Sequence, residues 1–291
     1  MPFIGAEDHS NNTSAQPFLD QVQSIASIKL ICLLTKAVQQ HRGATMGYLS
    51  GEQAFLDMAE RQSKTIDKLF ATYMQHNRFV EDAEPPMEVS QSLDSWQVIK
   101  YDWQSDELLR NFEFHSHLIE GLKKIIRSTI RENLMREELA GEERKGAKDQ
   151  HQQLLEMIFI TLPNVTESLA MLRGLSTNAA VVQACGRDSH MRLSFLIKDI
   201  PRQVKALSQA INQLETDYPA VKTLQLSKGL LRRLNALLRK INDKILNSRS
   251  IQEDSTQLFK VATDIVDAFW LSMEQGVLLI EQQIYNDLIN D

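Results

Sequence analysis

Apolar residues recur at three- and four-residue steps along almost the whole chain, and runs of strict alternation are missing. The first spacing marks one face of an α-helix, whereas alternation would mark a half-buried strand. Prolines interrupt helices, and they cluster at Pro85 and Pro86 before occurring singly at Pro163, Pro201 and Pro219. The pattern therefore predicts an all-α protein with breaks near these prolines.

We expect helices over residues 19–49, 51–79, 94–139, 151–161, 164–185, 190–218 (bent at the proline), 221–246 and 251–289. Three of them follow a capping box, in which a polar N-cap residue precedes Glu or Gln by three positions. The pairs are Ser50 with Gln53, Asn164 with Glu167, and Ser250 with Glu253.

The helix lengths predict two packed antiparallel four-helix bundles that share long helices. Residues 1–18 are polar and turn-prone, so we expect a flexible N-terminal segment there. No Gly/Ser-rich or Pro-rich linker divides residues 19–291, which are therefore expected to pack as one unit.

Composition narrows the classes of protein. Apolar residues make up 43% of the 291-residue chain, enough for a sizeable core, and the net charge of -6 disfavours nucleic acid as a partner. The two cysteines, Cys32 and Cys185, lie on apolar stretches and indicate buried thiols in a reducing compartment. With no secretion signal and no apolar run judged long enough to cross a bilayer, we expect a soluble, cytoplasmic protein.

An arginine lies on the apolar stripe of the first predicted helix, in the stretch "QQHRGATMGYLSG". Arg42 follows Val38 by four positions and precedes Thr45 by three. The arrangement recurs in the second half of the chain, where Arg173 follows Leu169 by four and precedes Ser176 by three. The two copies read Arg-Gly-x-Thr and Arg-Gly-x-Ser.

Arginines on an apolar stripe point to an anion, because a guanidinium group taken out of water stays charged. Its planar fork donates two parallel hydrogen bonds to a planar oxyanion, and a hydroxyl one turn along can add another. The adjacent Gly43 lets a helix or a ligand approach the backbone closely. The alternative is that each arginine reaches the surface or pairs with Asp or Glu on the next helix.

The segment from Leu34 to Phe70 resembles the opening of the nitrate- and nitrite-sensing (NIT) domain family. The matching residues are Gln39, Arg42, Gly43, Thr45, Tyr48, Leu49, Gln62, Thr65 and Asp67. The rest of the chain is similar to that family in helical character and length. The resemblance implies an all-helical sensor of two four-helix bundles that binds nitrate or nitrite through arginines at their interface.

The resemblance maps one of these arginines onto Arg42, and the internal repeat adds Arg173. For a third arginine from a late helix, Arg233 shares a stripe with Leu230 and Leu237, and Arg232 is its rival. His41 is a further candidate donor. NIT domains are usually joined to an output domain, and this chain contains no recognisable one, so the resemblance implies a separate protein partner. Dimerisation through the long helices is common in such sensors.

Other groups of residues give weaker indications of a functional site. His115 and His117 are two positions apart, so on a helix they point in different directions and do not share a metal. No glycine loop follows a strand to hold phosphate, no set of residues supports an enzyme, and we expect no metal and no cofactor. The basic stretch from Arg232 to Arg249 lacks interleaved aromatics and is expected to be helix surface.

Two functions remain open. The first is a non-enzymatic sensor that binds nitrate or nitrite through Arg42, Arg173 and Arg233, assisted by the hydroxyls of Thr45 and Ser176. The second is a helical scaffold that binds protein partners and needs no ligand. For the scaffold, Arg42→Met is expected to be neutral or stabilising, since a buried ion pair is often replaceable.

Overall fold

All regular structure in the described part of the chain is helical. The computed structural model describes residues 16–77, 84–134, 145–216 and 218–290. The helices are α1 (Gln16–Leu49), α2 (Leu56–His76), α3 (Met87–Lys100), α4 (Leu108–Thr129), α5 (Lys145–Glu156), α6 (Leu162–Val181), α7 (Arg187–Leu214), α8 (Lys228–Ile241) and α9 (Ser255–Asn290). The predicted all-α class is confirmed.

Six short helical segments extend or connect these helices. Three are 3₁₀ turns, η2 (Gln53–Phe55), η3 (Trp103–Ser105) and η7 (Pro219–Leu224). Three are π-helical turns, η4 (Ile130–Leu134), η6 (Met157–Thr161) and η8 (Asn242–Leu246). Of the segment predicted to be flexible, residues 1–15 lie outside the described residues, and residues 16–18 begin α1.

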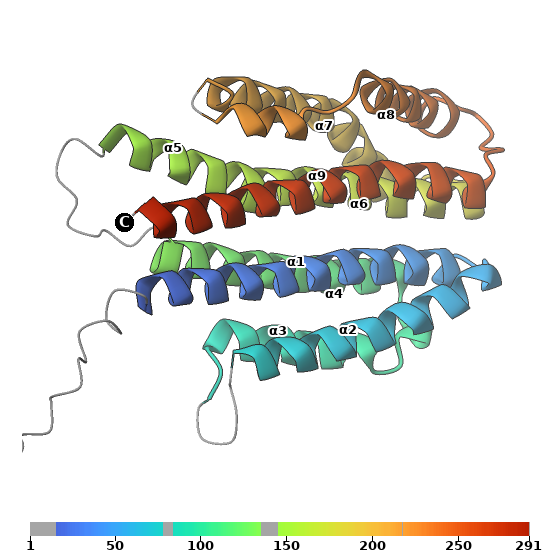
Figure 1. Cartoon of the computed structure of the whole chain (residues 1–291). Coiled ribbons are helices and arrows are strands. Elements are labelled where there is room, and N and C mark those ends of the chain that lie inside the picture. Colours follow the sequence, from blue (N-terminus) through green and yellow to red (C-terminus); the bar gives the residue numbers. More distant parts are fainter. Residues whose placement is uncertain (1–15, 78–83, 135–144, 217, 291) are drawn as a thin grey trace, which may run out of the picture.

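The helices run roughly parallel to one another, with α1 and α9 side by side across the middle of the molecule (Figure 1). In the N-terminal half, α1 packs against α2 and α4, and α3 packs against α4. In the C-terminal half, α6 packs against α7 and α9, and α8 packs against α9. The two halves meet where α1 contacts α6 and α9.

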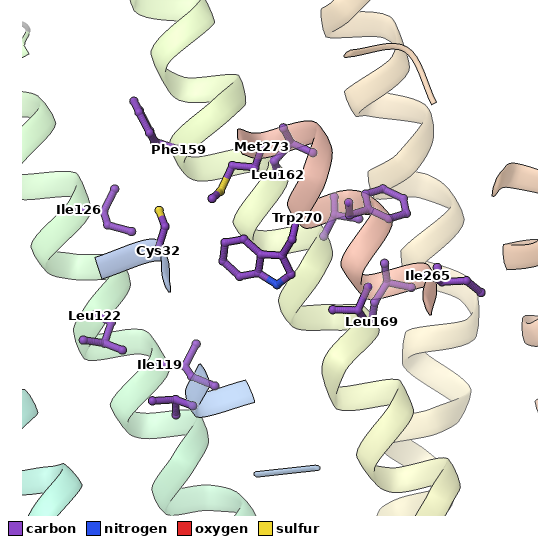
Figure 2. Close-up of a cluster of buried hydrophobic side chains, with 14 of the residues drawn as sticks. Cys32, Ile119, Leu122, Ile126, Phe159, Leu162, Leu169, Ile265, Trp270 and Met273 are labelled. Carbon is purple, nitrogen blue, oxygen red and sulfur yellow. The ribbon is translucent and has the colours of Figure 1, made fainter. Parts of the chain in front are cut away.

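One hydrophobic core crosses this boundary. The buried cluster contains Cys32 from α1 and Ile119 from α4 together with Leu169 from α6 and Ile265 from α9. Figure 2 shows the indole of Trp270 between the side chains of the two halves. The buried core is therefore continuous between the two halves.

Several predicted helix boundaries are wrong. The helix expected over residues 94–139 is broken at 101–107, where Asp102 adopts a left-handed backbone with φ of 53°. Ser50 caps no helix, because its hydroxyl donates to the Met46 carbonyl of α1, and Glu52 instead caps η2. The ends expected at residues 79 and 139 lie outside the described residues.

The break expected at Pro163 is also wrong. The π-helical turn η6 runs directly into α6, and Pro163 lies in the first turn of α6, where a missing N–H is tolerated. Asn164 therefore lies inside a continuous helix and does not cap one. At the start of α9 the Asp254 carboxylate accepts from Gln257 N–H, so the expected cap at Ser250 is replaced by Asp254.

Two helical stretches, Phe18–Leu49 and His151–Val181, are long and apolar enough to cross a membrane by length and composition. This corrects the sequence-based view that no run is long enough. The most apolar windows of the two stretches are 44% and 67% buried inside the protein. Buried core helices of soluble proteins have the same length and composition.

Candidate functional site

The Arg42 side chain lies fully buried at the contact between α1 and α6. Its Nη1 and Nη2 atoms donate to the two carboxylate oxygens of Glu167, at 2.7 and 3.0 Å. Nη1 also donates to the Ser116 hydroxyl of α4, and the guanidinium lies over the Phe112 ring, 5.0 Å from its centroid. Such a two-bond fork is the strongest geometry for an arginine–carboxylate pair. Arg42 therefore follows the alternative given by the sequence, in which a buried arginine pairs with an acid on another helix.

The Arg173 side chain is equally buried but is held differently. Its Nη2 donates to the Gln39 carbonyl at 2.8 Å, its Nη1 donates to the Thr263 hydroxyl at 3.1 Å, and its guanidinium lies over the Phe259 ring. Among the described residues, no carboxylate lies within ion-pair distance of it. Burial, and then the positive charge of Arg42, lower the pKa of Arg173 to about 10. Arg173 therefore remains charged at neutral pH without a direct counterion.

Gln39 connects the two arginines into one buried network. Its side-chain Nε2 donates to Glu167 Oε2 at 2.9 Å, so it shares the carboxylate that holds Arg42. Its Oε1 accepts from the indole N–H of Trp270 at 3.1 Å, and its backbone carbonyl accepts from Arg173. The network therefore joins α1, α6 and α9 at the meeting of the two halves.

The two Arg-Gly repeats face each other across the α1–α6 contact. A Cβ atom on Gly43 would lie 3.1 Å from Arg173 Nη2 and 3.0 Å from a Phe259 ring carbon. A Cβ on Gly174 would lie 2.7 Å from the Met46 sulfur. The expectation that Gly43 allows a close approach to the α1 backbone is confirmed, and the group that approaches is the Arg173 guanidinium.

The charges of this network do not balance among the described residues. Of the two guanidinium groups, only that of Arg42 has a described carboxylate, Glu167, within ion-pair distance. The Asp267 and Glu167 carboxylates act on Arg173 from farther away and raise its pKa, but less than burial and Arg42 lower it. The Nε atoms of both Arg42 and Arg173 are buried and have no hydrogen-bond partner among the described residues. Arg42, Arg173, Glu167 and Gln39 together carry one excess positive charge, and two buried N–H groups among them lack a partner, which is costly.

A pair of buried histidines adjoins the network. His115 Nδ1 lies 2.7 Å from the Asn111 carbonyl, which only accepts, so this nitrogen carries the proton. Burial lowers the pKa of His115 well below its usual value and that of His41 to about 3, so both rings are neutral. His115 Nε2 then accepts from His41 Nδ1–H at 2.7 Å.

The second nitrogen of His41 has no hydrogen-bond partner among the described residues. In the tautomer just derived, this Nε2 atom carries a lone pair. The His41 ring lies edge-on to Trp96 and Trp103, with centroids 5.2 and 5.9 Å away. His41 therefore donates to His115, and no hydrogen bond to an arginine or to the network is described for it.

The remaining predicted residues fall in different places. Thr45 is buried and donates to the Asn111 side chain at 2.8 Å, and Ser176 is buried and donates to the Arg173 carbonyl. The Thr45 hydroxyl therefore joins α1 to α4, and the Ser176 hydroxyl bonds within α6. Arg233 and its rival Arg232 are exposed on α8, whose buried face consists of leucines and Ile241. The structure does not bring either of them near Arg42 and Arg173. The prediction of a third arginine from α8 in this site is therefore wrong.

Sequence reasoning missed three members of the network. Glu167 was expected in a helix cap but holds Arg42. Trp270 was not selected, and its indole N–H donates to Gln39. Thr263 was not singled out. One signal was available for Glu167, because it is the one acid between Pro163 and Val181, a stretch that also contains Arg173.

The cysteines lie apart from the network, and both thiols are free. Cys32 is buried, as expected, and burial raises its pKa to about 12. Cys185 is only half-buried, which corrects the expectation of two buried thiols. Among the described residues, no group of three metal-ligating side chains comes together.

A cavity in the described part of the chain lies away from the arginine network. It has a volume of about 340 Å³ and is lined by polar residues from the start of α1 and α3 and the ends of α2 and α4, including Ser27. Ser27 and Arg42 are fifteen residues apart on α1, a rise of about 22 Å. The cavity is therefore separate from the arginine network.

Comparison with known proteins found no family model, no curated protein and no solved structure that matches this chain.

Proposed function

We propose that this protein is a non-enzymatic cytoplasmic sensor that binds a small oxyanion, nitrate or nitrite, and signals to a separate protein partner. The binding site is the buried network of Arg42, Arg173, Glu167 and Gln39. The single observation that carries the proposal is the excess of one positive charge in this network. A monoanion balances that charge, whereas a dianion would overshoot it.

The described network is the ligand-free state in this proposal. Glu167 holds Arg42, and the Gln39 carbonyl and the Thr263 hydroxyl hold Arg173. An anion that binds Arg173 replaces these weaker neutral acceptors with a charged one, which forms a stronger hydrogen bond. Arg173 is therefore the first point of contact.

Signalling follows from the position of the network between the halves. Arg42 belongs to α1, Arg173 to α6 and Thr263 to α9. We propose that the halves are two antiparallel four-helix bundles, supported by the packing of each helix mainly within its own half. An anion that binds one packing of the bundles more tightly shifts the population toward it, by no more than its differential affinity.

A thermal-shift experiment tests the proposal. Nitrate or nitrite at about 100 times its dissociation constant should stabilise the protein by about 2.7 kcal/mol, which corresponds to a rise in Tm of about 5 °C. Chloride at the same ionic strength should give no rise. Arg173→Lys keeps the charge but loses the planar fork, so we expect it to abolish the rise.

Arg233→Lys is the matched control, because it makes the same change at an exposed arginine of α8. It should respond to nitrate as the unaltered protein does. If millimolar nitrate and nitrite leave the Tm of the unaltered protein unchanged, the proposed ligand is wrong.

The second candidate function is the ligand-independent helical scaffold. The observation that favours it is the two-bond pair of Arg42 with Glu167, which satisfies both charges without a ligand. A scaffold predicts no anion-dependent Tm shift in any of these proteins, so the same experiment separates the two functions.

A further inference from the structure

The cavity at one end of the N-terminal half has the size of a small-molecule site. Its volume is about 340 Å³, and such sites range from about 300 to 1,000 Å³. The starts of α1 and α3 and the ends of α2 and α4 surround it, at the same end of the molecule (Figure 1). Asp20, Glu88 and Glu132 in its lining are exposed, so the cavity is open to solvent.

Two buried serines in the cavity wall have already used their hydroxyl hydrogens. Ser24 and Ser27 are 6% and 4% exposed. Ser24 donates to the Asp20 carbonyl, and Ser27 donates to Asn77 Oδ1 at 2.7 Å. The Asn77 amide nitrogen donates to the Tyr73 carbonyl, which fixes its oxygen as the acceptor. A hydroxyl has one hydrogen and two lone pairs, so both serines can only accept a hydrogen bond from a ligand.

Two half-buried hydroxyls at the end of α4 have the same property. Ser128 and Thr129 both donate to the Ile125 carbonyl, at 3.0 and 2.9 Å. No donor among the described residues bonds to any of the four hydroxyl oxygens of the wall. The wall therefore offers hydrogen-bond acceptors, and a ligand must bring the donors.

The side-chain charges in the described wall are all negative. Asp20 of α1, Glu88 of α3 and Glu132 of η4 line the cavity, and no lysine, arginine or histidine of the described residues does. The dipoles of two helix starts and two helix ends oppose one another, so the carboxylates determine the sign of the potential. The ligand should therefore be a cation that carries several N–H donors.

A bare metal ion is a poorer occupant than an organic cation. No three metal-ligating side chains of the described residues come together, so the three carboxylates of the cavity do not share one ion. They belong to three different helical segments. The wall also contains Val89 and Ile125, both buried, whose apolar surface a metal ion would not use. Separate acids and an apolar surface suit ammonium groups joined by methylene groups.

We propose that this cavity binds an aliphatic diamine or polyamine. The ammonium groups donate to the carboxylates and the hydroxyl oxygens of the wall, and the methylene groups pack on Val89 and Ile125. Hydrogen bonds from ammonium to carboxylate are charge-assisted and stronger than neutral ones. The site lies about 22 Å along α1 from Arg42, so it is distinct from the proposed anion site.

Isothermal titration calorimetry with putrescine and spermidine tests the site. Each should bind with one molecule per chain. n-Butylamine has a single ammonium group, as a lysine side chain does, and should bind at least about tenfold more weakly, because it lacks one charged contact. Glu88→Gln/Glu132→Gln should weaken the binding of both amines about tenfold or more for the same reason. Arg173→Lys should bind putrescine as the unaltered protein does, so this test is independent of the anion proposal.

Glu60→Gln/Glu107→Gln is the matched control. It removes the same charge from two exposed acids, on α2 and directly before α4, that do not line the cavity. It should bind putrescine with unchanged affinity. If both double variants lose affinity equally, the amines are attracted only by the overall negative charge, and the proposal is overturned. Absence of putrescine binding overturns it too, as does binding of n-butylamine or Mg²⁺ that is as tight as that of putrescine.

Discussion

Two arginines with the same sequence context have different partners in this protein. Arg42 is held by both oxygens of Glu167, while Arg173 donates to neutral acceptors and lies over the face of Phe259, with no carboxylate of the described residues in contact. The difference arises because the single buried acid of the network lies where α6 meets Arg42. Arg173 is therefore the residue whose chemistry is incomplete in the described network, and the sensor proposal depends on it more than on Arg42.

The buried histidines predict a loss of stability in mild acid. The pKa values of His41 and His115 are lowered by burial in the folded protein, so the unfolded chain binds protons first as the pH falls below about 6.5. Stability is full above that pH and declines toward the lowered pKa. Between pH 6 and pH 5 we expect the pair to cost about 2 kcal/mol in the free energy of unfolding.

Urea denaturation at several pH values measures this cost as a difference between proteins. His41→Phe/His115→Leu should lose about 2 kcal/mol less than the unaltered protein over that interval, because the carboxylates titrate in both. His117→Gln changes an exposed histidine of the same helix, so it should keep the original pH dependence. If the double variant and the unaltered protein lose the same stability, the two histidines bind protons equally well in the folded protein and in the unfolded chain.

At the scale of helices, hydrophobic periodicity predicted which segments are helical but not where several of them end. The missed break between α3 and α4 contains neither proline nor glycine, and it depends on a left-handed Asp102 that no local pattern indicated. The expected break at Pro163 is absent, because η6 runs directly into α6 and the helical chain continues through the proline. Tertiary packing decides both cases.

The two buried arginines of the candidate site could be predicted from the sequence, but the role of the Glu167 carboxylate could not. Arg42 and Arg173 could be selected because each interrupts an apolar stripe. Glu167 fitted a capping box, which is a local pattern. That pattern gave no indication of its actual partner, Arg42, which is 125 residues away. Arg233 fitted a stripe equally well, yet α8 turns it to the surface. Periodicity places a residue on a helix face, and only the packing of helices determines what that face contacts.

Gly47 gives a prediction about the junction of α1 and η2. A Cβ atom there would lie 2.4 Å from a Phe55 ring carbon, and Phe55 is buried against Phe259. In a helix, Gly→Ala normally gains about 1 kcal/mol. Gly47→Ala should instead lose about 1–3 kcal/mol, because the aromatic ring must move in a close-packed core.

Gly229 is the matched control within a helix. The nearest heavy atom to its added Cβ is the Ser227 hydroxyl at 3.7 Å, an ordinary contact. Gly229→Ala should therefore leave stability unchanged or raise it by up to about 1 kcal/mol in urea denaturation. A stabilised Gly47→Ala would mean that Phe55 is free to move.

At the scale of the whole molecule, the arginine network and the hydrophobic core occupy the same boundary. Cys32 and Ile119 of the N-terminal half share the core with Trp270 of the C-terminal half (Figure 2), and Trp270 also donates to Gln39. The polar network is thus embedded in the packing that joins the halves. A change of charge in the network acts on the interface itself, which is what a sensor of this design requires.

The pair of Arg42 and Glu167 predicts how strongly that interface depends on balanced charge. Arg42→Met leaves a carboxylate that is only 9% exposed without its partner, so we expect a loss of about 3–5 kcal/mol. This corrects the sequence-based expectation that Arg42→Met is neutral in a scaffold, which ignored the acid left behind. Replacement of both groups removes the ion pair and leaves neither partner buried as an unpaired charge.

Arg42→Met/Glu167→Leu should therefore recover stability to within about 1 kcal/mol of the unaltered protein, since apolar replacements of buried ion pairs are often neutral. Thermal and urea unfolding of the two single variants and the double variant give the coupling free energy. Arg233→Met, at an exposed site, should change stability by less than about 0.5 kcal/mol. If the losses of the single variants simply add, Arg42 and Glu167 do not act as a pair, and the charge count that leaves Arg173 without a counterion is wrong.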